Sequence, residues 1–190
     1  MKDKIINQIK DSISVKNSII DNCLNSIVES ANIMIDCVKL GNKVLWCGNG
    51  GSAADAQHLA TELMGGMINH ERKPIPSIAL TTDTSFITAW SNDTDFESVF
   101  SRQIQGLGKK DDVLIGISTS GKSENVIAAI KQAKYKGLKT ILLTGNSGGK
   151  IPHLSDVTIF VPSSDTQRIQ EGHIMIGQIL CSLVEDALSK

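Results

Sequence analysis

The stretch DVLIGISTSGKSENVIAAIKQAKYKG, residues 112–137, decides the fold because it joins a strand, a turn and a helix. Its first seven residues are apolar enough for a buried strand, and its last fourteen have the apolar spacing of a helix. The turn between them is rich in hydroxyls, contributed by Ser118, Thr119, Ser120 and Ser123. A helix N-terminus attracts anions, so this segment predicts a site for a single phosphate or another small oxyanion.

The same segment also matches the nucleoside-triphosphate pattern G-x-x-x-x-G-K-[ST] over residues 116–123. Two features argue against a triphosphate. Gly116 falls inside the expected strand, and the remaining loop STSG is too short and too poor in glycine to surround three phosphates. Ser123 taken alone is more typical of a helix cap than of a ligand. The cluster of hydroxyls favours the single-phosphate interpretation.

Four further β-rich runs are each followed by a turn and a helical pattern: KVLWC, PSIAL, KTILLT and VTIFV. With residues 112–118 they predict a five-stranded parallel sheet between two layers of helices, a three-layer α/β sandwich. Ligands of such sheets bind beyond the carboxyl ends of the strands. Those ends carry GNGGS, TTD, STSGKS, TGNSGG and VPSSD, all of them polar or glycine-rich.

Length and composition indicate one domain over residues 1–190, because 190 residues with 41% hydrophobic content suffice for one buried core. Residues 1–40 form a helical region and residues 41–190 the α/β core. The net charge is −1, and no basic stretch is present, so we expect no direct nucleic-acid partner.

Several features predict a cytoplasmic protein without a membrane partner. The first residues, MKDKIINQIK, lack the apolar core of a signal peptide. No run approaches the roughly 20 apolar residues that span a bilayer. Cys23, Cys37, Cys47 and Cys181 are scattered without a C-x-x-C pair, which is typical of reduced thiols.

The N-terminal region has helical spacing from residue 4 to residue 40, and one apolar series recurs every seven positions. Its members are Ile6, Ile13, Ile20, Ile27 and Met34. Such a series packs either against the chain's own sheet or against other subunits. The spacing alone does not separate the two.

The first strand end is the richest in candidate residues, within CGNGGSAADAQHLATEL at residues 47–63. Gly48, Gly50 and Gly51 allow the backbone to approach a ligand closely. Ser52 and Asp55, three residues apart, resemble a capping box at the start of the next helix.

On that helix, His58 and Glu62 are four residues apart and therefore share one face. The pair either forms an ordinary surface ion pair or serves as a metal site or an acid and base. Its place near the ligand end of the sheet favours the functional interpretation.

Six motifs together resemble the phosphoheptose isomerases of the sugar isomerase (SIS) domain family: GNGGSAADAQHLATEL, ALTTDTS, SND, VLIGISTSGKSENVI, LTGNSGGK and PSSDTQRIQEGHIMIG. The resemblance runs from about residue 41 to the C-terminus. It implies an isomerase that converts sedoheptulose 7-phosphate to D-glycero-D-manno-heptose 7-phosphate for bacterial lipopolysaccharide or capsule. It also implies a sugar phosphate in the STSGKS loop instead of ATP, and a homotetramer with N-terminal helices at its centre and active sites between subunits.

The resemblance further assigns roles, residue by residue. The implied sugar contacts are Asn49, Gly50, Gly51, Asn92 and Asp93. The implied phosphate ligands are Ser118, Thr119, Ser120 and Ser123. The implied zinc ligands are His58, Glu62, Gln170 and position 178, and Glu62 and Gln170 also contact the substrate. Glu62 resembles the general base, which suits an isomerisation in which one carboxylate moves a proton between adjacent carbons.

Two positions depart from the family pattern. Gln178 stands where members carry a histidine that binds metal and donates a proton, and an amide does not exchange protons near neutral pH. His173 is a poor substitute, because on a helix it lies about 140 degrees from Gln178. Gly66 stands where members usually carry an arginine, and Arg72 is out of register with it.

These departures keep two hypotheses open. The leading one is an isomerase, with zinc binding and the acid step weakened by Gln178. The alternative is a non-catalytic member of the family that binds a sugar phosphate or a replication-initiator partner. The intact base Glu62 and the hydroxyl loop favour the enzyme.

Overall fold

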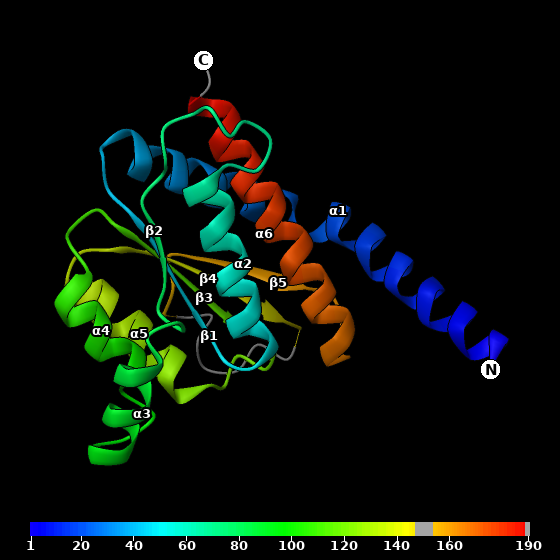
Figure 1. Ribbon diagram of the computed structural model, residues 1–190. Coiled ribbons are helices and arrows are strands. Elements are labelled where there is room, and N and C mark those ends of the chain that lie inside the picture. Colours follow the sequence, from blue (N-terminus) through cyan, green and yellow to red (C-terminus); the bar gives the residue numbers. More distant parts are fainter. Residues whose placement is uncertain (147–153, 189–190) are drawn as a thin grey trace.

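The five β-rich runs form one parallel sheet in a computed structural model that describes residues 1–146 and 154–188 (Figure 1). The strands are β1 (Val44–Gly48), β2 (Ser77–Ala79), β3 (Val113–Ser118), β4 (Lys139–Gly145) and β5 (Val157–Val161). Their order is β2-β1-β3-β4-β5, with every pairing parallel. The predicted sheet is therefore confirmed. The TGNSGG loop after β4 lies outside the described residues from position 147 onward.

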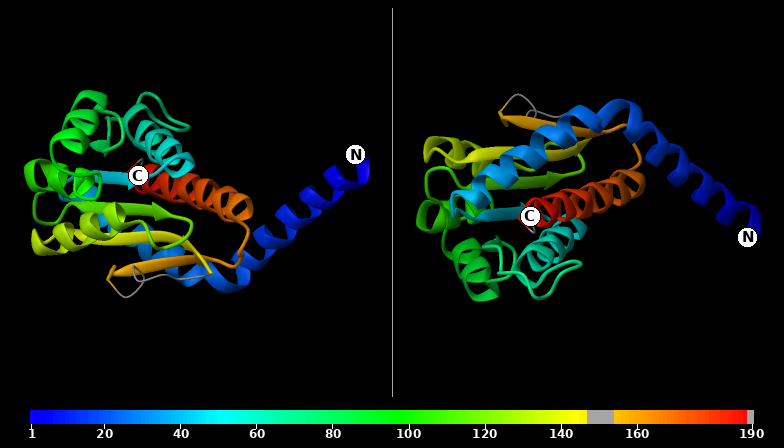
Figure 2. Two further views of the ribbon diagram at one scale, coloured as in Figure 1. Left: turned by 90° about the horizontal axis from the view of Figure 1, so that it is seen from below. Right: turned by 90° about the horizontal axis from the view of Figure 1, so that it is seen from above.

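Helices cover both faces of the sheet, as the sequence predicted (Figures 1 and 2). One layer consists of α1 (Lys2–Lys39), α2 (Gly51–Gly65) and α6 (Thr166–Leu188). The other consists of α4 (Val99–Leu107) and α5 (Glu124–Tyr135), with α3 (Thr84–Asp93) packed against α4.

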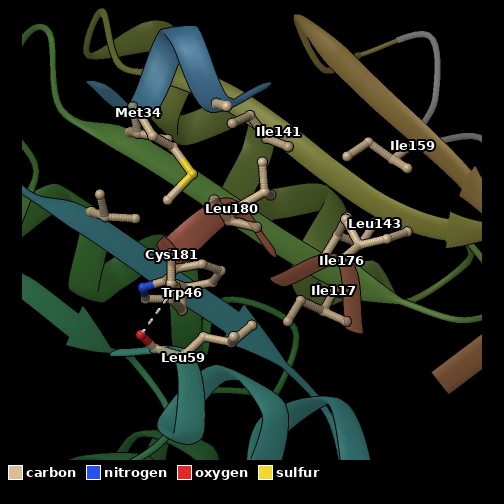
Figure 3. Close-up of a cluster of buried hydrophobic side chains, with 14 of the residues drawn as sticks. Met34, Trp46, Leu59, Ile117, Ile141, Leu143, Ile159, Ile176, Leu180 and Cys181 are labelled. Carbon is tan, nitrogen blue, oxygen red and sulfur yellow. Dashed lines mark hydrogen bonds between the residues drawn. The ribbon is translucent and has the colours of Figure 1, made fainter. Parts of the chain in front are cut away.

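The sheet has a hydrophobic core on each face, and alternate residues of a strand pack in different cores. The reason is that successive side chains of a strand point to opposite faces. Ile115 and Ile117 of β3 face the layer of α1, α2 and α6, whereas Leu114 faces α4 and α5. The largest side chain in the first core is Trp46, which is fully buried. Its indole N–H donates a hydrogen bond of 2.9 Å to Oγ of Ser77, so this buried polar group is satisfied (Figure 3). Strands buried on both faces account for the continuous apolar runs in the sequence.

The heptad series of α1 divides into two halves. Ile27 and Met34 are 6% and 0% exposed and pack in the core, so the second half of α1 covers the chain's own sheet. Ile6, Ile13 and Ile20 are 46%, 53% and 66% exposed. In Figure 2 the N-terminal part of α1 projects away from the body of the chain. One 38-residue helix thus combines core packing with an uncovered apolar face.

The four cysteines, Cys23, Cys37, Cys47 and Cys181, are buried free thiols. Among the helices of the described residues, none combines the length and hydropathy that crossing a membrane requires.

Candidate functional site

The glycine loop joins β1 to α2 at the carboxyl edge of the sheet. Helix α2 begins at Gly51 with Gly50 as its N-cap and with no side-chain capping hydrogen bond. The predicted capping box of Ser52 and Asp55 is therefore wrong. Ser52 already lies inside the helix, where its backbone N–H donates to the carbonyl oxygen of Asn49.

Gly51 allows another element to approach, as the sequence predicted for these glycines. A Cβ at this position would overlap the side-chain amide of Gln170 on α6. The absence of a side chain at residue 51 thus lets Gln170, one of the predicted ligands, lie against the start of α2. Asp55 lies one turn further along α2, where burial raises its carboxyl pKa although the Gln170 amide and His58 act in the opposite direction.

The hydroxyl loop follows β3 and ends at α5, as predicted. Ser123 occupies the N-cap position of α5, but its hydroxyl caps no backbone amide. It instead lies 3.0 Å from the hydroxyl of Ser118. The Ser120 hydroxyl accepts a hydrogen bond of 3.2 Å from the N–H of Lys122, and the carbonyl oxygen of Thr119 accepts one from Gly145. Ser123 is therefore the N-cap residue by position, but its side chain pairs with Ser118 instead of capping the helix.

The faces of α2 and α6 bring together three predicted residues. Nε2 of His58 lies 2.9 Å from Oε1 of Glu62, as their spacing on one face requires. The amide nitrogen of Gln178 lies 3.4 Å from the same imidazole nitrogen. The side chain of His58 is 47% exposed and that of Glu62 is 22% exposed, so the cluster is open to a ligand. Position 178 thus lies beside His58, the partner of the proposed base.

A second amide contact links the two loops of the site. The side chains of Asn49 and Asn125 exchange two hydrogen bonds, of 2.8 and 2.9 Å. Asn49 also lines a cavity of about 170 Å³, together with Gly48, Gly50, Ala53, Thr81, Ile87, Phe96 and Phe100. The cavity extends from the glycine loop to α3 and α4.

Asn92 and Asp93, the two sugar contacts predicted on α3, are hydrogen-bonded to each other. They form the exposed C-terminal end of α3, where the Asn92 amide donates to the Asp93 carboxylate at 2.8 Å. Helix α3 borders the cavity through Ile87. The structure therefore does not join these two predicted sugar contacts to the glycine loop.

The loop after α2 explains the departure at Gly66. Gly66 has a φ of 99°, and a Cβ there would lie 2.7 Å from the carbonyl oxygen of Asn69. An arginine at this position would therefore require a different loop conformation. Arg72 does not replace it, because its guanidinium is bound to the carboxylate of Glu185 at 2.7 Å and to the carbonyl oxygen of Glu62 at 2.9 Å.

Glu185 organises this loop from the far end of α6. Its carboxylate accepts hydrogen bonds from the backbone N–H groups of residues 67, 68 and 69, in addition to the guanidinium of Arg72. Burial alone would raise the pKa of this carboxyl group, but Arg72 and the three amides outweigh it and lower the pKa of Glu185 to about 2. Through Arg72, α6 is therefore tied to the backbone of Glu62.

His173 cannot serve in place of the missing histidine, as its helical position predicted. It is fully buried, whereas Gln178 faces His58. Within the described part of the chain, neither ring nitrogen of His173 has a hydrogen-bond partner of good geometry. Burial lowers the pKa of His173 to about 4, and the nearby backbone of Thr144 offsets only part of this effect.

The donor set around Glu62 suits a metal only in part. His58 and Glu62 are ordinary zinc ligands, whereas Gln170 and Gln178 offer amide oxygens, which bind zinc weakly. Across residues 1–146 and 154–188, no group of three or more His, Cys, Asp and Glu side chains is arranged to hold a metal ion. Of the four predicted ligands, His58 and Glu62 are thus the two strong zinc donors that the structure brings into contact.

Sequence reasoning missed two residues of this region. Asn125 could have been noticed as a second polar residue just after the hydroxyl loop, in SEN. Glu185 had no local signal, because its partners lie more than a hundred residues away in sequence. Asp55 was noted only as part of a cap.

The fold and the site together define a class: α/β domains that bind a small phosphorylated ligand at the carboxyl edge of a parallel sheet. The model of the SIS domain family matches residues 9–145. The chain belongs to the SIS domain family and, within it, to the phosphoheptose isomerases, as the following similarities establish.

Two sequence relatives and two solved structures are similar over most of the chain. The phosphoheptose isomerase of a Nitratiruptor species is 56% identical over 85% of this chain and 86% of its own length. That of Aquifex aeolicus is 50% identical over 98% of this chain and 97% of its own length. The phosphoheptose isomerase structure from Neisseria gonorrhoeae has a TM-score of 0.92 at 41% identity, covering 97% of this chain and 98% of its own. The structure from Francisella tularensis has a TM-score of 0.93 at 38% identity, covering 97% of each chain.

Proposed function

We infer that this chain is a sugar-phosphate isomerase that converts sedoheptulose 7-phosphate to D-glycero-D-manno-heptose 7-phosphate. The observation that carries this inference is 50% identity to a phosphoheptose isomerase over 98% of the chain. The chain also keeps the carboxylate and the hydroxyl loop that the reaction needs. We assign the product to the heptose of a bacterial lipopolysaccharide or capsule, and the reaction to the cytoplasm.

The hydroxyl loop holds the phosphate in this proposal. Ser118, Thr119, Ser120 and Ser123 directly precede α5, and the first backbone N–H groups of a helix have no intrahelical partner. Hydroxyl and amide donors at one helix end suit the charge and size of a single phosphate. The phosphate thereby fixes one end of the sugar chain relative to the glycine loop.

Glu62 moves the proton. Isomerisation shifts a carbonyl group between C1 and C2, so a base must remove a proton from one carbon and return it to its neighbour. The contact with Nε2 of His58, 2.9 Å long, holds the Glu62 carboxylate on the open face of α2. Asn49, Gly50 and Gly51 contact the sugar from the start of α2, Gln170 contacts it from α6, and Asn92 and Asp93 remain predicted sugar contacts from α3.

A second proton must move between the two oxygens of the sugar. Gln178 lies at the position that would serve this step, 3.4 Å from His58, but an amide has no exchangeable acid proton near neutral pH. Turnover is therefore slower than a histidine at this position would allow. A zinc ion held by His58 and Glu62, with weaker contacts from Gln170 and Gln178, would polarise the carbonyl oxygen when bound.

We also propose that the chain assembles as a homotetramer. The exposed residues Ile6, Ile13 and Ile20 form an apolar face on a helix that projects from the body, and such a face is stabilised when other subunits cover it. Light scattering of the intact protein tests this assembly. A monomer at micromolar concentration would contradict it.

The central experiment is an assay of sedoheptulose 7-phosphate conversion with and without added zinc. We expect measurable conversion, increased by zinc. Binding of the sugar phosphate without any conversion under either condition would contradict the enzyme and support a non-catalytic sugar-phosphate-binding protein. Conversion that is unaffected by zinc and by chelators would retain the isomerase and reject the metal.

A further inference from the structure

The paired amides of Asn49 and Asn125 connect two loops that are far apart in sequence. Asn49 lies between β1 and α2, and Asn125 is the second residue of α5, immediately after the hydroxyl loop. The two residues are 76 positions apart. Asn125 is 3% exposed, while Asn49 is only partly buried and lines the cavity of about 170 Å³. One member of the pair is thus anchored in the protein and the other reaches the site.

The pairing fixes the orientation of both amides. Each side chain donates one N–H to the oxygen of the other, at 2.8 and 2.9 Å. Rotating either amide alone by half a turn would oppose oxygen to oxygen and N–H to N–H, which removes both hydrogen bonds. Asn49 therefore keeps one orientation for as long as Asn125 keeps its own.

The pairing also leaves Asn49 able to bind a ligand. A carboxamide has two N–H groups and an oxygen with two lone pairs, and the pair uses one N–H and one lone pair of each residue. One N–H of Asn49 remains for a group in the cavity. A buried side chain that hydrogen-bonds a ligand-contacting side chain restricts the orientation of the second side chain. Asn125 is placed to act on Asn49 in this way.

We propose that Asn125 is a positioning residue, which holds the amide of Asn49 in one orientation toward the sugar while the neighbouring hydroxyl loop holds the phosphate. The inference rests on the proposed function, because it takes Asn49 as a sugar contact. It adds a residue whose side chain contacts neither sugar nor phosphate, and it explains how the two ends of the site keep a fixed spacing.

The test compares four proteins: the wild type, Asn125→Ala, Asn49→Ala and the double variant. We expect Asn125→Ala to lower kcat about 10- to 100-fold, the range for a misplaced contact, and to change the inhibition constant of inorganic phosphate less than about twofold. In the Asn49→Ala background, the same substitution should change kcat less than about twofold, because its effect passes through Asn49. Asn125→Asp is an additional variant at the same position. It keeps the size of the side chain and a hydrogen-bond acceptor but loses the N–H donor. We expect it to lower kcat by a comparable factor.

Ile130→Val is the matched control, since Ile130 is fully buried on the same helix and lies in the core. It should lower stability slightly and leave kcat and phosphate inhibition unchanged. The proposal is overturned if Asn125→Ala acts equally in both backgrounds, if phosphate inhibition weakens in parallel with kcat, or if the control shows the same loss.

A failure of the proposed function would be visible separately, because the wild type would then convert no sedoheptulose 7-phosphate. In that case, calorimetric affinities of the same four proteins for sedoheptulose 7-phosphate replace kcat. Additive losses at positions 49 and 125 would still reject the positioning role, and non-additive losses would support it.

Discussion

The two halves of the site are built in different ways. The hydroxyl loop is local: its residues lie within a single turn between β3 and α5, and Ser118 and Ser123 contact each other directly. The cluster of His58, Glu62 and Gln178 is assembled by packing α2 against α6, and Gln178 is 120 positions from His58. The local half keeps the family pattern. Both departures, Gly66 and Gln178, fall in or beside the half that depends on packing.

Because the two halves depend on different contacts, we expect phosphate binding and proton transfer to be separable. A phosphate can be held by one strand–turn–helix unit whatever happens at α6, whereas proton transfer requires two helices in register. The Arg72–Glu185 ion pair, 2.7 Å long, supports that register from the far end of both helices. Variants in the two halves should therefore fail in different ways.

The largest effect is expected from Glu62→Gln, which removes the base and keeps the shape of the side chain. Turnover of sedoheptulose 7-phosphate should fall about 100- to 10,000-fold, the usual contribution of a general base. Binding of the sugar phosphate, measured by calorimetry, should remain within a few-fold of the wild type. A proportional loss of binding would show that the two halves are not independent.

The reverse pattern is expected when the hydroxyl loop is changed. Replacing Ser120 and Ser123 by alanine should weaken sugar-phosphate binding by roughly 1 to 3 kcal/mol, the range for hydrogen bonds to a charged group. Equilibrium binding measures this loss, and added ATP should not compete. Tight competition by ATP would restore the triphosphate interpretation of the loop.

A smaller change, and a gain, is expected from Gln178→His. An imidazole beside His58 and Glu62 adds a proton donor and a stronger zinc ligand, so turnover should rise about tenfold and zinc affinity should increase. Zinc affinity is measured on the protein without substrate, which separates the metal from the reaction. If neither quantity changes, residue 178 does not take part in the site.

The smallest effect on activity at neutral pH is expected at Glu185, which binds Arg72 and the loop after α2. The folded-state pKa of Glu185 is about 2, below the ordinary value of 4.5, so the folded protein keeps this carboxylate charged where the unfolded chain takes up a proton. Its stabilisation is complete above pH 4.5 and is lost as the pH falls toward 2. Denaturant unfolding across this range should show a steeper loss for the wild type than for Glu185→Gln. Equal slopes would contradict the assignment.

The fold class, the strands and the polar loops at the strand ends could be predicted from the sequence alone. Each of these depends on local properties. Apolar runs such as VLIGIS indicate a strand that is buried on both faces, and hydroxyls or glycines at strand ends indicate the ligand-binding edge of the sheet. Family membership followed from the same segments. The heptad series of α1 predicted a helix with one apolar face, but its period did not show what covers that face.

The tertiary structure decided which partners those segments meet. It separated the buried Met34 from the exposed Ile13 on one helix, and it paired residues as distant as 49 with 125 and 72 with 185. It also buried His173 while turning Gln178 toward His58. The physical reason is that the position of a residue in the sequence fixes the face of the helix or strand on which its side chain lies. The residue that it contacts depends on the order of the strands and on how closely two helices approach. Gly51 is an example, because it has no Cβ and Gln170 of α6 can therefore lie against the start of α2 in the folded chain.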